Sequence, residues 1–248
     1  MSPLTDRRVL VTRAAEDCAE LEELLRARGA RPVRMPCIAF EDSPQAAQVA
    51  QFVQNADLVV VSSPHGAQRL LSLCADLYKT PLAAVGEATA RALGGRARFP
   101  RSGSGAQALL DELGDTVRGK RVLLPRAQRS TPSLAKGLRA AGAQVEDFVL
   151  YKTIVPALAE PRALRALQDG LIDVIAFASG SAVRGFVQLV GARSAERSAI
   201  ACLGPTAAGA ALAAGLVPEW RGEGDGLIEL CDGVALAVAR RNDYPIVQ

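Results

Sequence analysis

Short polar or glycine-containing segments follow the apolar, strand-like runs of this sequence. A helix that begins just after a parallel strand offers free N–H groups and a dipole that favours anions. We therefore predict that these segments, which include Gly222 to Gly226, bind a small anionic ligand. The candidate binding residues are Thr12, Arg13, Ser62, Ser63, Gly86, Thr89, Arg126, Ser179, Ser181, Gly204 and Thr206.

A purely structural role is the alternative for each of these residues. Ser and Thr after a strand are ordinary helix N-caps. Arg13 and Arg126 occupy matching strand ends, but each can instead pair with a neighbouring surface carboxylate. The residue types leave both interpretations open.

The single histidine, His65, is a candidate general acid because imidazole titrates near neutral pH. It directly follows Ser62-Ser63-Pro64 at an expected helix start, where the helix dipole disfavours a positive ring. We therefore expect His65 to be a solvent-exposed cap residue with no direct part in catalysis.

The elements that must position these residues alternate between strand and helix patterns. Short β-rich runs precede segments of helical periodicity at residues 9–12, 58–61, 122–124 and 174–177. In the first helical segment Leu21, Leu24 and Leu25 share one face, with Glu22 opposite and Gly29 at the expected end. Continuously apolar strands separated by helices predict an α/β fold with parallel sheets covered on both faces.

The strand and helix patterns also repeat along the chain. Arg8 to Arg13 matches Arg121 to Arg126, an offset of 113 residues, and Gly86 matches Gly204 at an offset of 118. An offset that drifts so little indicates a duplicated half-molecule. We predict two similar parallel-sheet α/β lobes with a binding cleft between them.

A dinucleotide-binding fingerprint is a rival reading, because Gly103 to Ala108 fits the pattern G-x-G-x-x-A and opens an expected helix. The preceding segment, residues 96–101, is a poor buried strand, and the next strand ends at Arg126 where the fingerprint expects an acid. Since an NADP enzyme can use an arginine there, an NADP-dependent oxidoreductase stays an alternative function. A non-catalytic two-lobed ligand-binding module is another.

Composition narrows the class of protein. The 248 residues are 49% hydrophobic, enough for two cores, and a net charge of +3 with 4% aromatic residues is too mild to indicate nucleic acid. The five cysteines are widely spaced within apolar patterns, so we interpret them as core residues rather than disulfide partners or metal ligands. Without an export pattern or an apolar run of spanning length, we expect a soluble cytoplasmic protein.

Six short motifs spread over most of the chain together resemble those of a known protein family. They are Val11-Thr12-Arg13, Ser62-Ser63-Pro64, Ala84 to Ala90, Val149 to Thr153, Ser179 to Val183, and Cys202 to Ala207. In order and spacing they resemble the uroporphyrinogen-III synthase family, from about Arg7 to Leu236. Ala178 and Ala207 depart from the family, which tends to have threonine at both positions, so neither position offers a hydroxyl here.

The resemblance implies how the two lobes are built from the chain. One lobe comprises residues 1–37 and 155–248, the other residues 42–150, and two extended connectors, 38–41 and 151–154, join them.

The resemblance also implies a reaction in tetrapyrrole biosynthesis, the route to haem, sirohaem, cobalamin and chlorophyll. It is the dehydration and cyclisation of hydroxymethylbilane to uroporphyrinogen III, with inversion of the last pyrrole. No metal or nucleotide cofactor is required, because the electron-rich pyrroles expel the hydroxyl once it is hydrogen-bonded or protonated. The enzyme must mainly hold the chain so that the substituted ring carbon attacks.

Tyr151 is the catalytic candidate in this reading. A phenol is a neutral donor for the leaving hydroxyl, and we expect the connector position to face the cleft. The alternative is a tyrosine that packs across a pair of strands. We expect a monomer that binds a small linear tetrapyrrole, binds neither nucleic acid nor membrane, and makes transient contact with the enzyme supplying its unstable substrate.

Overall fold

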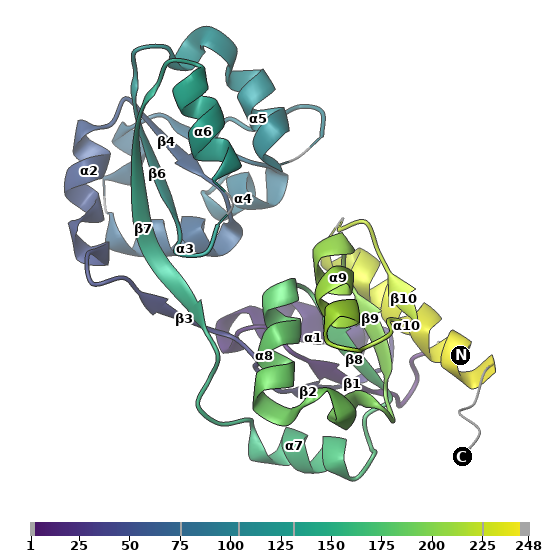
Figure 1. Ribbon diagram of the computed structural model, residues 1–248. Coiled ribbons are helices and arrows are strands. Elements are labelled where there is room, and N and C mark those ends of the chain that lie inside the picture. The colour runs from purple at the N-terminus through teal and green to yellow at the C-terminus, as the bar shows by residue number, and fades with distance from the viewer. Residues whose placement is uncertain (1–2, 75, 104, 131, 225, 244–248) are drawn as a thin grey trace. The chain divides into compact units, whose positions relative to one another are not determined.

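The computed structural model describes residues 3–74, 76–103, 105–130, 132–224 and 226–243. The chain divides into two compact units, each with its own sheet of mainly parallel strands (Figure 1). Unit 1 consists of the chain up to Ala39 and from Ile154 onward, and unit 2 spans Phe40–Thr153. The chain passes from unit 1 to unit 2 after Ala39 and returns to unit 1 after Thr153.

Unit 1 has a sheet in the order β10-β9-β8-β1-β2 with helices on both faces (Figure 1). Its strands are β1 (Arg8–Val11), β2 (Arg31–Arg34), β8 (Val174–Phe177), β9 (Ala199–Cys202) and β10 (Trp220–Arg221). Its helices are α1 (Cys18–Ala27), α7 (Pro161–Gln168), α8 (Gly180–Val190), α9 (Pro205–Ala213) and α10 (Leu227–Asp243), with 3₁₀ turns η1 (Ala15–Asp17) and η5 (Ala192–Ala195).

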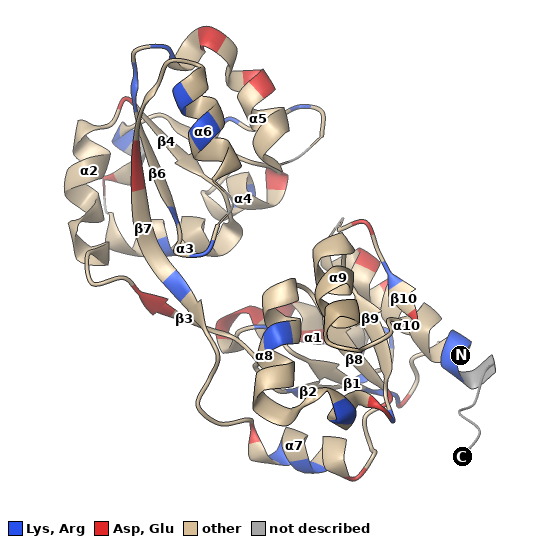
Figure 2. Ribbon diagram, in the orientation of Figure 1, with Lys and Arg blue, Asp and Glu red and all other residues tan. Residues whose placement is uncertain are grey.

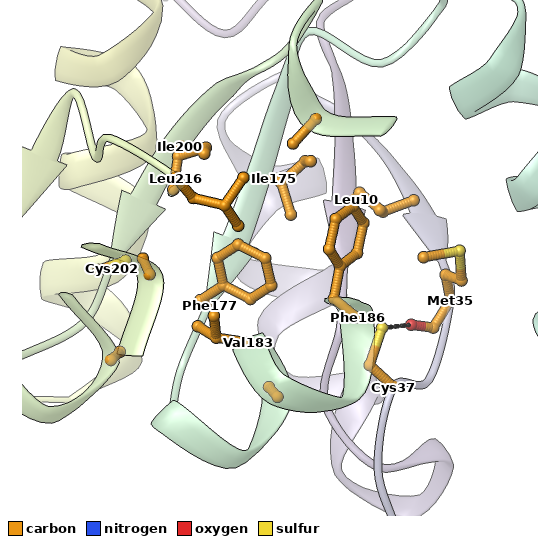
Figure 3. Close-up of a cluster of buried hydrophobic side chains, with 14 of the residues drawn as sticks. Leu10, Met35, Cys37, Ile175, Phe177, Val183, Phe186, Ile200, Cys202 and Leu216 are labelled. Carbon is orange, nitrogen blue, oxygen red and sulfur yellow. Dashed lines mark hydrogen bonds between the residues drawn. The ribbon is translucent and has the colours of Figure 1, made fainter. Parts of the chain in front are cut away.

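The central strands β8 and β9 of unit 1 are apolar without interruption because both faces of the sheet are buried there. Ile175 and Phe177 of β8 face one core, where they pack with Phe186 of α8 (Figure 3). Val174 and Ala176 of the same strand face a second core beside α1 and α10. This alternation along one strand explains why the sequence shows a run rather than a polar and apolar pattern.

Unit 2 has a sheet in the order β3-β7-β6-β4-β5. Its strands are β3 (Ala39–Asp42), β4 (Leu58–Val61), β5 (Leu82–Ala84), β6 (Arg121–Ala127) and β7 (Gln144–Ile154). Its helices are α2 (Val49–Asn55), α3 (Pro64–Leu73), α4 (Glu87–Ala92), α5 (Gly105–Leu113) and α6 (Ser133–Ala140), with 3₁₀ turns η2 (Ala46–Gln48), η3 (Leu77–Lys79) and η4 (Gly114–Val117).

The two sheets have the same strand order when the strands that correspond in the sequence repeat are matched: β1 with β6, β2 with β7, β8 with β4, and β9 with β5. Unit 1 runs β2-β1-β8-β9-β10, and unit 2 runs β7-β6-β4-β5, followed by a parallel bridge between Ala83 and Arg98 in place of a fifth strand. This is the doubly wound order in which strand order reverses beside the first strand. The reversal points are β1 with β8 in unit 1 and β6 with β4 in unit 2, and the expectation of two similar α/β lobes is confirmed.

The two expected connectors overlap β3 and β7, which are neighbouring strands of the unit 2 sheet. The Ser43 N–H donates to the Leu150 carbonyl at 3.0 Å, and the Ser43 hydroxyl donates to the Val149 carbonyl at 2.6 Å. Lys152 forms an ion pair with Glu41 at 2.9 Å across the same two strands. The segments that join the units are therefore ordered by backbone pairing rather than merely extended.

The first helix departs from its expected pattern at Glu22. Leu21 and Leu25 are buried as predicted, and Gly29 adopts a φ of +85° at the turn after the helix. Glu22, expected on the solvent face, is only 5% exposed. Arg34 at the end of β2 donates to both of its oxygens, at 2.6 and 2.8 Å, and holds the pKa of the Glu22 carboxyl below its usual range.

Both units carry charged residues of both signs. Figure 2 shows Lys and Arg interspersed with Asp and Glu over the helices of both units. Among the described residues, no helix combines the length and the apolar character needed to cross a bilayer.

All five cysteines are free and buried, as the sequence predicts. Burial raises the pKa of the unit 1 thiols from 9.0 to about 12 for Cys37 and Cys202, and to about 11 for Cys18 and Cys231. The pKa values of these thiols are higher in the folded chain than in the unfolded chain. At a pH between the folded and unfolded pKa values, the folded chain therefore binds more protons than the unfolded chain. The resulting stability is complete below pH 9 and is lost as the pH rises toward 11 to 12.

We expect the free energy of unfolding of unit 1 to fall between pH 9 and 10.5, with each thiol adding a slope of about 1.4 kcal/mol per pH unit. Urea titrations followed by the fluorescence of Trp220, which lies in unit 1, measure it. Cys37→Ala should show a shallower slope than the wild-type chain. Equal slopes in the two proteins would contradict the assignment to buried thiols.

Candidate functional site

The predicted binding residues lie at the carboxyl ends of the strands in both units. In unit 1 they follow β1, β8 and β9, and in unit 2 they follow β4 and β5 or, for Arg126, lie in the last two residues of β6. These ends include both strand-order reversal points, where doubly wound sheets bind their ligands. Each edge also receives the N-termini of the helices that follow the strands.

Two serines at equivalent places of the repeat cap helices. Ser63 precedes α3 and accepts the N–H of Gly66 at 3.0 Å. Ser179 precedes α8 and accepts the N–H of Ala182 at 3.2 Å. Both have the extended backbone of an N-cap residue, so the N-cap alternative describes what these two hydroxyls do in the structure.

The threonines divide between interior and surface. Thr12 is fully buried, and its hydroxyl donates to the Ala176 carbonyl at 2.8 Å, tying β1 to β8. Thr89 in α4 is 3% exposed. Thr206 at the start of α9 is exposed. Of these three side chains, Thr206 is the one with appreciable surface for a ligand.

The remaining unit 1 candidates and the matching unit 2 glycine lie at helix starts. Gly86 and Gly204 are the N-cap residues of α4 and α9. The Ser181 hydroxyl accepts from Arg184 at 3.1 Å on the surface of α8. Backbone N–H groups at these helix starts, rather than side chains, are what this part of the edge offers an anion.

Both candidate arginines have carboxylate neighbours. Arg13 lies 4.0 Å from Asp17, one helical turn along the chain. Arg126 is paired with Asp147 of β7 and also donates to the carbonyls of Ala127 and Gln128, at 3.0 and 3.1 Å. The structure thus realises the ion-pair alternative for both, and Arg126 is the more firmly fixed of the two.

A cavity of about 310 Å³ opens at the carboxyl edge of unit 2, beside the reversal point. Arg126 and Ser62 line it, together with Gly105 and Ser133 from the starts of α5 and α6. Sequence reasoning named Arg126 and Ser62 but missed Ser130, Ser133 and Asp147, because α6 and β7 come to this edge only through the fold. The cavity combines hydroxyls and helix N-termini with an arginine whose charge Asp147 already balances.

An aromatic cluster surrounds the start of α3. His65 stacks on Phe40 of β3 with ring centroids 3.5 Å apart, and its ring meets Tyr151 of β7 edge to face at 4.7 Å. His65 is therefore half-buried rather than a solvent-exposed cap residue, because both strands of the β3 and β7 pair pack against it. Phe40, which sequence reasoning missed, lies within the expected connector 38–41.

Tyr151 is 5% exposed, and its phenolic oxygen lies 3.0 Å from the hydroxyl of Ser63. Its ring also meets Phe40 edge to face at 5.5 Å. The residue thus packs across strands, as the structural alternative predicts, while its polar end reaches the capped start of α3 at the carboxyl edge.

The glycine-rich loop after β10 already holds a carboxylate of this chain. Glu229 of α10 accepts the N–H groups of Glu223 and Gly224, at 2.8 and 3.1 Å. The predicted anion donors of Gly222 to Gly226 therefore bind an internal acid in this structure, and residue 225 lies outside the described residues.

The dinucleotide fingerprint lacks the strand it needs. Gly105 begins α5, but the preceding segment contributes only the isolated bridge at Arg98, and Ser104 lies outside the described residues. A fingerprint that does not follow a buried strand cannot present its glycines to a pyrophosphate in the usual way. The geometry therefore does not favour the oxidoreductase alternative.

Comparisons with known proteins agree with one another. The family model described as uroporphyrinogen-III synthase HemD matches residues 19–221. Uroporphyrinogen-III synthase of Synechococcus elongatus is 28% identical over 225 residues, covering 82% of this chain and 84% of the relative. The chloroplastic uroporphyrinogen-III synthase of Oryza sativa is 26% identical over 222 residues, covering 84% and 73%.

A solved structure shares the fold. The crystal structure of uroporphyrinogen-III synthetase from Helicobacter pylori matches with a TM-score of 0.62 at 18% identity, covering 94% of this chain and 100% of the other. At this identity the likeness concerns the fold alone. The family match spans most of the chain, and by it the chain belongs to the uroporphyrinogen-III synthase family.

Proposed function

We propose that the protein converts hydroxymethylbilane to uroporphyrinogen III, losing water and inverting the last pyrrole ring. The observation that carries this proposal is the family match across residues 19–221. The protein is accordingly an enzyme of tetrapyrrole biosynthesis, a carbon–oxygen lyase.

The reaction asks little acid–base chemistry of the protein. The terminal hydroxyl leaves as water once a donor supplies hydrogen bonding or a proton, and the adjacent pyrrole nitrogen provides the electrons that form an azafulvene. Left alone, this species closes to the uninverted isomer. Attack by the substituted carbon of the last ring instead gives a spiro intermediate, so the enzyme works mainly by holding the chain in that geometry.

Within this mechanism we assign the donor role to Tyr151. Its phenol is neutral, and its ring is fixed by Phe40 and His65. Its oxygen lies beside Ser63 at the carboxyl edge of unit 2, where the N-terminus of α3 begins. A donor held this firmly costs little reorganisation when the hydroxyl leaves.

The substrate carries two carboxylates on each pyrrole, so binding calls for many anion donors. We propose that one carboxylate-bearing arm enters the unit 2 cavity lined by Arg126, Ser62 and Ser133. The helix starts at Gly86, Gly204 and Thr206 offer backbone donors to other carboxylates.

Purified protein incubated with hydroxymethylbilane tests the proposed function, with the product isomers resolved chromatographically. We expect uroporphyrinogen III to predominate over the uninverted isomer, which forms alone without enzyme. A product mixture identical to that of the buffer blank would contradict the proposal and favour the non-catalytic ligand-binding module.

Arg126→Ala is expected to weaken product binding by about 1 to 3 kcal/mol, because the cavity loses its cation while Asp147 remains. Arg13→Ala is expected to act in the same direction. Titration calorimetry under anaerobic, low-salt conditions measures the effect, which added salt should reduce. Arg118→Ala is the control, since Arg118 forms an ion pair with Asp115 before β6, away from the carboxyl edge, and this pair is more exposed than those of Arg13 and Arg126. If Arg13→Ala and Arg126→Ala both bind as tightly as the control, these arginines have no part in binding.

Location and assembly complete the proposal. A cytoplasmic location is supported by five free, buried thiols, a state that a reducing compartment maintains; the rice relative is a chloroplast protein. We also propose a monomer that takes its unstable substrate through transient contact with the supplying enzyme. Cell fractionation and sedimentation with and without that enzyme test these points.

A further inference from the structure

We propose that Asp147 sets the affinity of the unit 2 cavity for carboxylates, because its own carboxylate competes with an incoming one for Arg126. The cavity is the one that Ser62, Arg126, Ser133 and Asp147 line. This inference rests on the proposed function, in which a carboxylate-bearing arm of the tetrapyrrole enters that cavity. It gives a role to an acid that the sequence pattern did not indicate.

All three nitrogens of the Arg126 guanidinium already donate hydrogen bonds within unit 2. Nε and Nη2 donate to the two oxygens of Asp147, the second at 3.3 Å. Nη1 donates to the backbone carbonyls of Ala127 and Gln128, at 3.0 and 3.1 Å. A ligand carboxylate that makes the usual two-pronged contact with a guanidinium must therefore displace Asp147 or one of these carbonyls.

The sequence repeat carries the opposite charge at the position of Asp147. In unit 2, Asp147 of β7 lies in register with the residue two places before Arg126. In unit 1, Arg34 of β2 lies in register with the residue two places before Arg13. The strand-end arginine is thus kept in both units, whereas its neighbour is an acid in one and an arginine in the other. The sheet itself does not require an acid at position 147.

The two strand-end arginines differ in how they are held. Arg13 and Asp17 lie 4.0 Å apart, which is beyond hydrogen-bonding distance. Arg126 instead donates to both oxygens of Asp147, and the two side chains are only 22% and 27% exposed. Water and salt screen a partly buried pair less than an open surface pair, so a ligand carboxylate in the cavity meets both charges of this pair.

The chemistry of the proposed reaction gives a reason for weak binding at this arm. Dehydration and ring closure leave the carboxylates of the tetrapyrrole in place, so a contact with them binds substrate and product alike. Such uniform binding lowers KM without raising kcat, and contacts kept by the product oppose its release. A cavity whose arginine is balanced by Asp147 places the arm and still releases it with the product.

Asp147→Asn tests the proposal, because it removes the competing charge and keeps the size of the side chain. We expect it to tighten binding of uroporphyrinogen III by about three- to tenfold, the effect of losing one nearby like charge. Anaerobic titration calorimetry at low salt measures this affinity. In steady-state assays KM should fall by a similar factor, and kcat should not rise.

Asp115→Asn is the control for net charge. It removes the same charge from the exposed ion pair with Arg118, before β6 and away from the carboxyl edge. We expect it to change the affinity by less than about twofold, since charges on the open surface are screened by salt. Thermal unfolding of both variants checks that unit 2 stays folded.

A second readout needs no tetrapyrrole. Phenylglyoxal modifies guanidinium groups, and peptide mass mapping gives the rate at each arginine. We expect Asp147→Asn to raise the rate at Arg126 and to leave the rate at Arg13 as in the wild-type chain, because only Arg126 loses its bound carboxylate.

The outcomes separate the competing explanations. Unchanged binding in Asp147→Asn would show that Asp147 does not compete with the ligand, and weaker binding would show that it holds Arg126 in place for the ligand. Equally tight binding in Asp115→Asn would trace the effect to net charge and also overturn the proposal. If the wild-type chain neither binds nor forms uroporphyrinogen III while Arg126 still becomes more reactive in Asp147→Asn, the proposed function fails and the hold of Asp147 on Arg126 stands.

Discussion

Tyr151→Phe is expected to slow formation of uroporphyrinogen III by about ten- to a thousandfold, the range typical for loss of one positioned proton donor. Complete loss is not expected, because positioned backbone donors still bias the ring closure. The substitution removes one oxygen and leaves the ring to pack on Phe40 and His65, so the fold of unit 2 should persist. Single-time-point assays with both isomers quantified measure the effect.

The isomer ratio carries more information than the rate. As the enzymatic route slows, spontaneous closure to the uninverted isomer should take a larger share of the product. His65→Ala should cost much less, since it removes ring packing rather than the donor beside Ser63. Full rate and isomer purity in Tyr151→Phe, together with loss of both in His65→Ala, would make the histidine the proton donor.

The fold was predictable from the sequence because its strongest signals are local and repeated. The apolar runs at β4 and β8 match the observed strands residue for residue, since burial on both faces makes every position apolar. The sequence repeat, at offsets of about 113 to 118 residues, is still detectable because both units need the same strand ends and the same glycine turns.

The contacts within the candidate site were not predictable in the same way. Tyr151 and Ser63 are 88 residues apart, and nothing local in either segment says that a phenol will meet a helix cap. By its helical position Glu22 belongs to the polar face of α1. It is buried in the structure because Arg34 of β2 packs against it and balances its charge. Such pairs depend on how two elements pack, and a one-dimensional pattern of polar and apolar residues does not contain that information.

Gly185→Ala is expected to destabilise unit 1 by about 3 kcal/mol or more, the upper range for overpacking a core. A Cβ at position 185 would lie 1.9 Å from the carbonyl oxygen of Cys37, so backbone would have to move. That backbone is held on its other side, because the Cys37 N–H donates to the Thr12 carbonyl at 3.2 Å and its thiol donates to the Met35 carbonyl at 3.2 Å (Figure 3). Neither the backbone of α8 at residue 185 nor the backbone at Cys37 can move away without losing hydrogen bonds or packing.

Urea unfolding followed by Trp220 fluorescence measures this effect in the intact chain, because Trp220 lies in β10 of the same unit. Gly209→Ala on α9 is the matched control: a Cβ there meets nothing within 4 Å, and alanine favours a helix over glycine by about 1 kcal/mol. The two substitutions should therefore shift the midpoint in opposite directions. Equal midpoints for Gly185→Ala and the wild-type chain would mean that α8 and the segment leaving β2 do not approach as closely as the structure places them. The expected loss of stability would instead show that the segment at Cys37, through which the chain leaves unit 1, can pack against α8 only if residue 185 is glycine.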